Sequence, residues 1–140
     1  MKPYVLIVDD EETIRKLLKS RLEREGYEGV TASNGTEGEA CFDGKREYSV
    51  MITDLKMPGK DGFQLIEAVK EKYPKTRSIL ITGHGDKEAA VKSLKLGAAD
   101  YLEKPFDMDE LAHTVRRCMR EYGLEKENAD LVDRLEARIE

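Results

Sequence analysis

The segment Tyr4-Val-Leu-Ile-Val-Asp-Asp-Glu-Glu12 joins an unbroken apolar run to a cluster of acids, and it decides the fold. A strand that is apolar at every position, without alternation, is typical of a parallel sheet covered by helices on both faces. A second such segment, Tyr48-Ser-Val-Met-Ile-Thr-Asp54, also ends in an acid. The C-terminal ends of parallel strands lie at the edge where open α/β sheets bind ligands. The sequence therefore predicts that Asp9, Asp10 and Asp54 meet in one crevice.

Strand and helix patterns alternate five times along the chain. Strands are predicted over residues 4–9, 28–33, 49–54, 78–82 and 100–103, and helices over residues 12–26, 36–44, 62–72, 86–96 and 107–122. Five such units predict an α/β fold, a doubly wound five-stranded parallel sheet of the flavodoxin-like type with strand order 2-1-3-4-5. In that order the topological switch point lies between the first and third strands, which are the strands that end in the three aspartates.

The bulk composition predicts one ordinary soluble domain with a short appendage. The chain has 140 residues, of which 39% are apolar and 38% charged, with a net charge of −5. The acidic balance argues against a nucleic-acid surface. No apolar run approaches the ~20 residues of a membrane span, and Cys41 and Cys118 lack metal-ligand spacing, so we expect reduced thiols and a cytoplasmic protein.

The composition changes after Gly123, which suggests a globular domain over residues 1–122 and a charged helical extension over residues 123–140. The segment from residue 124 onward holds six acids and three bases. Leu124 and Leu131 are seven residues apart, as are Asn128 and Leu135, a spacing that fits a short two-stranded coiled coil with Asn128 setting its register. Three interpretations stay open: a dimerising or signalling helix, a solvated end of the last helix, and a disordered stub.

Three acids in one crevice repel one another unless a cation lies between them. Mg²⁺ takes one or two carboxylates and keeps several waters, so Asp10 and Asp54, with help from Asp9, suit it. An aspartate at a strand end can also act as a nucleophile that accepts a phosphoryl group, and Asp54 is the natural candidate. Lys104, after the fifth strand, and Thr82, at the end of the fourth, could supply a charge and a hydroxyl to that group.

Each of these residues has a structural explanation when taken alone. An aspartate after a strand commonly caps the next helix, and a single threonine or lysine in a turn is usually structural or solvated. The five together, all at C-terminal strand ends, indicate a functional site.

The same residues carry a resemblance to a known family, the receiver domain of two-component response regulators. The matching elements are Asp9-Asp10, Asp54, Met57-Pro-Gly-Lys-Asp-Gly62, Thr82 and Gly97-Ala-Ala-Asp-Tyr-Leu-Glu-Lys-Pro-Phe106. The resemblance covers residues 3–121 without a gap. It implies that Asp54 takes phosphate from a phosphohistidine on a sensor histidine kinase. It also implies that Asp9, Asp10, Asp54 and the backbone carbonyl of Lys56 hold Mg²⁺.

The resemblance assigns further roles around the phosphate. Thr82 and Lys104 would contact the phosphoryl group, and the Lys104–Pro105 peptide bond would be cis. Tyr101 would be the switch aromatic, turning inward as Thr82 moves and remodelling the surface of the fourth helix, fifth strand and fifth helix. The chain would then be a signalling phosphoacceptor with self-catalysed phosphotransfer and autodephosphorylation rather than an enzyme. A homodimer would form through that surface or the C-terminal helix.

The sequence is also similar to the receiver domains of nitrogen-regulatory-type activators and of hybrid kinases. We therefore expect the output domain or partner to lie outside residues 1–140. Two alternatives remain in view. A phosphatase of the haloacid dehalogenase type also uses a strand-end aspartate and Mg²⁺, but it wants an acid where this chain has Lys56. A receiver-like interaction domain that no longer takes phosphate would not need the complete acceptor set.

Overall fold

Strands and helices alternate through residues 2–139, the part of the chain that the computed structural model describes. The strands are β1 (Tyr4–Val8), β2 (Glu28–Ala32), β3 (Tyr48–Asp54), β4 (Arg77–Thr82) and β5 (Asp100–Glu103). The helices are α1 (Glu12–Arg24), α2 (Gly35–Ala40), α3 (Gly62–Lys72), α4 (Lys87–Lys95) and α5 (Met108–Ile139). The five strands form one parallel sheet in the order β2-β1-β3-β4-β5. The predicted fold class and strand order are confirmed.

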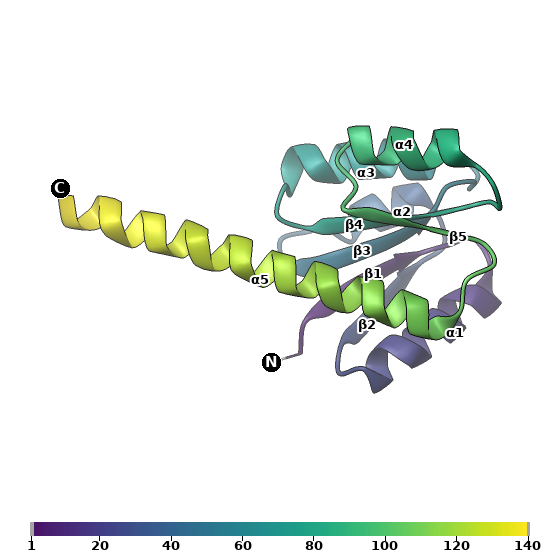
Figure 1. Ribbon diagram of the computed structural model, residues 1–140, viewed down its shortest axis with the longest axis horizontal. Helices are drawn as coiled ribbons and strands as arrows, with labels where there is room; N and C mark the ends of the chain where they lie inside the picture. Colours follow the sequence, from purple (N-terminus) through teal and green to yellow (C-terminus); the bar gives the residue numbers. More distant parts are fainter. Residues whose placement is uncertain (1, 140) are drawn as a thin grey trace.

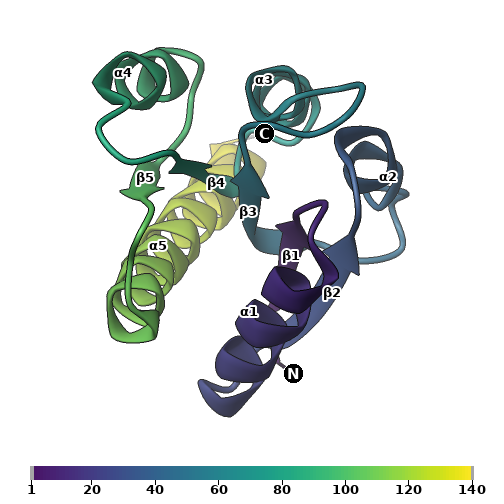
Figure 2. The same cartoon turned by 90° about the vertical axis from the view of Figure 1, so that its right-hand side faces the viewer.

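Helices cover both faces of the sheet. Figures 1 and 2 show α1 and α5 on one face and α2, α3 and α4 on the other. Successive residues of β1 point to opposite faces, so Val5 and Ile7 pack under α1 and α5 whereas Leu6 and Val8 pack under α3. The central strand β3 is buried along its whole length, which explains why Val50, Met51 and Ile52 are apolar in succession, without alternation.

The register of the sheet brings the acidic strand ends to the same level. Val8 pairs with Thr53, so the next residues, Asp9 and Asp54, follow at adjacent strand ends. On the other side, Lys104 donates its backbone N–H to the carbonyl of Thr82 at 2.9 Å. The parallel ladder alone therefore places the crevice at one edge of the sheet.

Two predicted helix ends differ from the observed ones. Helix α1 ends at Arg24 instead of residue 26, because Gly26 has a φ of +97° and the N–H of Tyr27 turns back to the carbonyl of Leu22. Helix α2 ends at Ala40 instead of residue 44. Beyond it the chain turns so that Phe42 stacks on Tyr73, with ring centroids 4.9 Å apart.

The last predicted helix and the predicted helical extension form a single element. The helix expected over residues 107–122 continues as α5 without a break through Gly123 to Ile139 and projects from the body (Figure 1), which contradicts the interpretation of this segment as a disordered stub. Leu124, Leu131 and Leu135 are about half exposed on this extension. The side chain of Asn128, like those of residues 129–130, 133 and 137–139, lies outside the described part, so its predicted role in setting register stays a prediction.

Cys41 and Cys118 are free thiols, as predicted. Within residues 2–139, none of the helices combines the length and the apolar character that crossing a membrane requires.

Candidate functional site: the carboxylate crevice

Three carboxylates converge where β1 and β3 end. Carboxylate oxygens of Asp9, Asp10 and Asp54 all lie within 4.8 Å of one another. Asp9 and Asp54 are buried, whereas Asp10 is exposed. The sequence predicted this grouping, and the parallel register produces it. Oxygen ligands at this spacing suit a hard divalent cation.

Three polar atoms of Asp9 have hydrogen-bond partners, whereas a fourth has none among the described residues. Its N–H donates to the carbonyl of Ala32 at 3.2 Å, and its Oδ1 accepts the N–H of Glu11 at 2.9 Å. Its backbone carbonyl accepts Nη1 of Arg15 at 2.7 Å. Its Oδ2 is buried and has no hydrogen-bond partner among the described residues. A buried carboxylate oxygen without a partner is costly, and a bound cation would satisfy it.

Asp54 lies beside the side chain of Lys104, the residue that follows β5. Its Oδ1 accepts the N–H of Leu55 at 3.0 Å and lies 3.5 Å from Nζ of Lys104. Burial raises the pKa of Asp54, and Lys104 acts in the opposite direction. Burial likewise raises the pKa of Asp9, with a further contribution from the charge of Asp54. The site therefore concentrates negative charge that burial and mutual repulsion oppose.

Neither of the predicted switch residues, Thr82 and Tyr101, lines the crevice. The hydroxyl of Thr82 is buried and points toward the carbonyl of Leu102, at a long 3.5 Å. Tyr101 is partly buried against the core on the α3 and α4 face. The Lys104–Pro105 peptide bond is cis.

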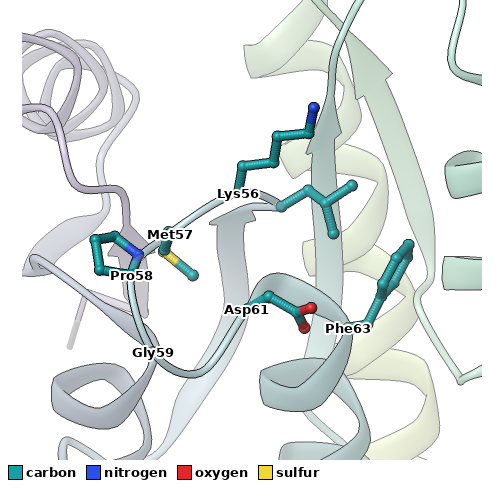
Figure 3. Close-up of a pocket in the computed structure, with 7 residues that line it drawn as sticks. Lys56, Met57, Pro58, Gly59, Asp61 and Phe63 are labelled. Carbon is teal, nitrogen blue, oxygen red and sulfur yellow. The ribbon is translucent and has the colours of Figure 1, made fainter.

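The crevice itself is a cavity of about 290 Å³. It is lined by Asp10, Glu11, Asp54, Leu55, Lys56, Ile81, Gly83, Asp86 and Lys104. A larger pocket, of about 590 Å³, lies on the neighbouring loop after β3, where the Lys56 side chain extends away from Pro58 and Asp61 (Figure 3). Its described lining contains a single carboxylate, that of Asp61, so the smaller cavity is the candidate site.

Sequence reasoning missed two residues that shape the crevice. Arg15 in α1 donates to the carbonyl of Asp9 from six positions along the chain. Asp86 lines the cavity and also caps α4, its side chain accepting the N–H of Ala89 at 3.1 Å. An aspartate after Gly83-His-Gly is a recognisable helix-capping signal. Nothing in the sequence around Arg15 indicates that its side chain binds the backbone carbonyl of Asp9.

The chain matches the family described as the response regulator receiver domain over residues 5–116. A response regulator described as NtrX-like from Rickettsia felis is 40% identical over 129 residues, which is 91% of this chain and 27% of the relative. The DNA-binding transcriptional regulator NtrC of Salmonella typhimurium is 39% identical over 84% of this chain and 25% of the relative. The chain thus spans about a quarter of the length of these curated relatives.

A solved structure agrees with the sequence relatives. A receiver domain protein from Clostridium thermocellum superposes with a TM-score of 0.82 at 36% identity, covering 87% of this chain and 98% of that one. The family match spans the five strands from residue 5 onward, helices α1 to α4, the start of α5 and every crevice residue from Asp9 to Lys104. The chain therefore belongs to the response regulator receiver domain family of two-component signalling systems.

Proposed function

We propose that the domain accepts a phosphoryl group on Asp54 from a phosphohistidine of a sensor histidine kinase, in a Mg²⁺-dependent reaction. The convergence of three carboxylates at the end of β1 and β3, with Lys104 3.5 Å from Asp54, carries the proposal. Family membership supports a signalling role over that of a haloacid dehalogenase-type phosphatase.

The residues present fit a Mg²⁺ site. The partnerless Oδ2 of Asp9 and the raised pKa values of Asp9 and Asp54 mark a place where a cation relieves buried negative charge. Asp9, Asp10 and Asp54 would hold the ion, with the backbone carbonyl of Lys56 as a further ligand. When bound, the ion supplies neutralising charge to phosphoryl oxygens.

The transfer step uses residues of this chain in separate roles. A carboxylate oxygen of Asp54 attacks the phosphorus, the O–P bond forms, and the P–N bond to the partner's imidazole breaks, with the electron pair leaving on that nitrogen. Asp54 thereby exchanges one negative charge for a dianionic or nearly dianionic phosphoryl group. Lys104, within reach of Asp54, contributes a positive charge to the phosphoryl oxygens.

The switch follows from a change of partner at Thr82. Its hydroxyl makes only a long contact with the Leu102 carbonyl, so a phosphoryl oxygen at Asp54 offers a stronger, charge-assisted acceptor. Movement of Thr82 toward the phosphate opens space beside Tyr101, and the surface of α4, β5 and α5 changes with it. That surface would then control an output domain or a downstream partner.

Acetyl phosphate with Mg²⁺ tests the proposal directly. We expect the intact mass to rise by one phosphoryl group in the wild type, and no rise after chelation or in Asp54→Asn. Asp43→Asn, an exposed aspartate on the loop before β3, is the matched control and should be modified normally. Modification of Asp54→Asn at the wild-type rate would overturn the proposal. Multiple-turnover phosphate release from aryl phosphates would favour the phosphatase instead.

A further inference from the structure

A chain of ion pairs joins strand β5 to the projecting part of α5. The guanidinium of Arg117 pairs with Oδ2 of Asp100, at the start of β5. Nε of Arg117 lies 3.6 Å from Oε1 of Glu121 on the same helix. Arg77, the first residue of β4, then holds two carboxylates: Nη2 lies 2.8 Å from Glu121 and Nη1 3.5 Å from Glu125. We call Asp100, Arg117, Glu121, Arg77 and Glu125 the charged ladder.

The ladder begins at Asp100, which binds the backbone of Tyr101, the proposed switch residue. Oδ1 of Asp100 accepts the N–H of Tyr101 at 2.8 Å, while its Oδ2 takes Arg117. A single carboxylate thus ties the main chain at Tyr101 to α5. The helical members, residues 117, 121 and 125, are spaced by four and share one face of the helix.

A second set of contacts lies beside the ladder and involves the same part of α5, around Tyr122 and Lys126. We call these contacts the Tyr122 anchor. Tyr122 is only 8% exposed. Burial raises its pKa, and so does its hydrogen bond with Glu47. One turn later, Nζ of Lys126 lies 3.1 Å from Oε2 of the same Glu47. Together these contacts place α5 against β3 and β4 for about one turn beyond Gly123.

We propose that the charged ladder makes the first turn of the extension part of the receiver body and couples its orientation to strand β5 at Tyr101. The body therefore ends near Lys126 and not at residue 122. Gly123 is a weak point for a helix, since glycine lowers helix stability by about 1 kcal/mol against alanine. Ion pairs on both sides of it hold the helix through this position. The coupling is a property of the unmodified protein and goes beyond the phosphorylation proposed above.

Amide hydrogen exchange on the full 140-residue chain tests the anchor. Arg77→Gln removes both carboxylate contacts of the ladder at β4. We expect exchange at residues 121–126 to speed up by about threefold to tenfold, with β3 amides unchanged as a monitor of the fold. Arg116→Gln is the matched control, because Arg116 lies on the same helix but pairs with Glu25 of α1 at 2.9 Å. Equal effects of the two variants, or none from Arg77→Gln, would overturn the anchor.

Glu125→Gln provides a second variant should Arg77→Gln unfold the protein. Its side chain is half exposed, so the fold should survive, and exchange at residues 122–126 should still rise. Salt gives a further readout, since ~1 M salt shortens the screening length to about 3 Å. Added salt should raise wild-type exchange at these residues toward that of Arg77→Gln; salt-insensitive exchange would count against an electrostatic anchor.

Asp100→Asn tests the coupling along the ladder. It keeps an acceptor for the N–H of Tyr101 but removes the charge that holds Arg117. We expect faster exchange at residues 121–126, although the change lies in β5. An effect confined to residues near 100 and 117 would show that the ladder is not continuous. Because no phosphate is involved, the outcome is independent of whether Asp54 is a phosphoacceptor.

Discussion

At the residue scale, Asp54 lies in an environment that opposes its own charge. It is 8% exposed, and burial raises its pKa more than Lys104 lowers it. Asp54→Asn keeps the shape and the acceptor for Leu55 while removing the buried charge. We expect the free energy of unfolding in metal-free buffer at pH 7 to rise by about 1 kcal/mol, measured by urea denaturation. Asp43→Asn should leave it unchanged, and a loss of stability in Asp54→Asn would contradict the electrostatic account.

The raised pKa of Asp54 also determines how the stability difference between Asp54→Asn and the wild type varies with pH. A carboxyl group whose pKa is higher in the folded protein favours folding at pH values below the unfolded pKa, and that contribution is lost as pH rises through the folded pKa. Protonated Asp54 is neutral, like asparagine. We therefore expect the stability gain of Asp54→Asn to shrink as the pH is lowered from about 7 to about 4. Urea denaturation of both proteins across this range measures it, and a gain that grows at low pH would refute the prediction.

The positions of the site residues could be predicted from the sequence, but their hydrogen-bond partners could not. Asp9, Asp10 and Asp54 follow apolar runs, and strand ends in a parallel sheet share one edge, so their meeting follows from periodicity. The direction of the Thr82 hydroxyl depends on where the Leu102 carbonyl lies, which only the assembled β4–β5 pair determines.

At the scale of elements, α3 approaches β3 so closely that only glycine fits at its first position. A Cβ on Gly62 would lie 2.6 Å from the carbonyl oxygen of Asp54 and 2.9 Å from Leu80. We expect Gly62→Ala to lower the free energy of unfolding by about 2 kcal/mol, because α3 or the end of β3 must shift. Chemical denaturation measures this loss.

Gly123→Ala is the matched comparison within another helix. Nothing lies within 4 Å of a Cβ built there. Alanine in a helix interior is favoured over glycine by about 0.5–1 kcal/mol. We expect Gly123→Ala to leave the fold intact and to slow amide exchange in residues 121–126. A stability loss equal to that of Gly62→Ala would show that close contact is not the reason glycine occupies position 62.

Helix existence was predictable at this scale, whereas two helix lengths were not. Asn34 and Asp61, residue types that favour N-caps, lie directly before α2 and α3, and their side chains accept the N–H groups of Glu37 and Gln64. Beyond the early end of α2, Phe42 packs between Tyr48 and Tyr73, and Tyr73 is distant in sequence. The pattern after Gly123 predicted a helical extension, but not that it would continue α5 without a break; the contacts of Arg77 and Glu47 with this stretch come from parts of the chain distant in sequence.

At the scale of the whole molecule, the topology places the carboxylate crevice and the projecting part of α5 on different parts of one body. The crevice lies at the C-terminal ends of the strands, whereas the ladder and the Tyr122 anchor lie near the start of β3 and β4. Helix α5 packs along the sheet between these ends and then projects beyond it (Figure 1). The anchor proposed above would give the first turn of the extension a defined direction relative to the crevice.

The extension presents an apolar stripe that predicts self-association. Leu124, Leu131 and Leu135 are 48–56% exposed and follow the spacing of a coiled-coil seam. In the predicted two-stranded coiled coil, two such stripes bury one another. We expect sedimentation velocity to show a concentration-dependent dimer that Leu131→Glu weakens strongly.

Leu17→Glu is the control for that measurement, because Leu17 is equally exposed, at 48%, but lies on α1. It should leave the dimer unchanged. Two heptads form a short seam, in which only a few leucines are buried. The repulsion between the like charges of two acidic extensions offsets part of the stabilisation that this burial provides. Added salt should therefore strengthen the dimer by screening this repulsion, whereas a dimer through charged pairs would weaken. A monomer at every concentration, or a dimer lost equally in both variants, would remove the extension as the interface.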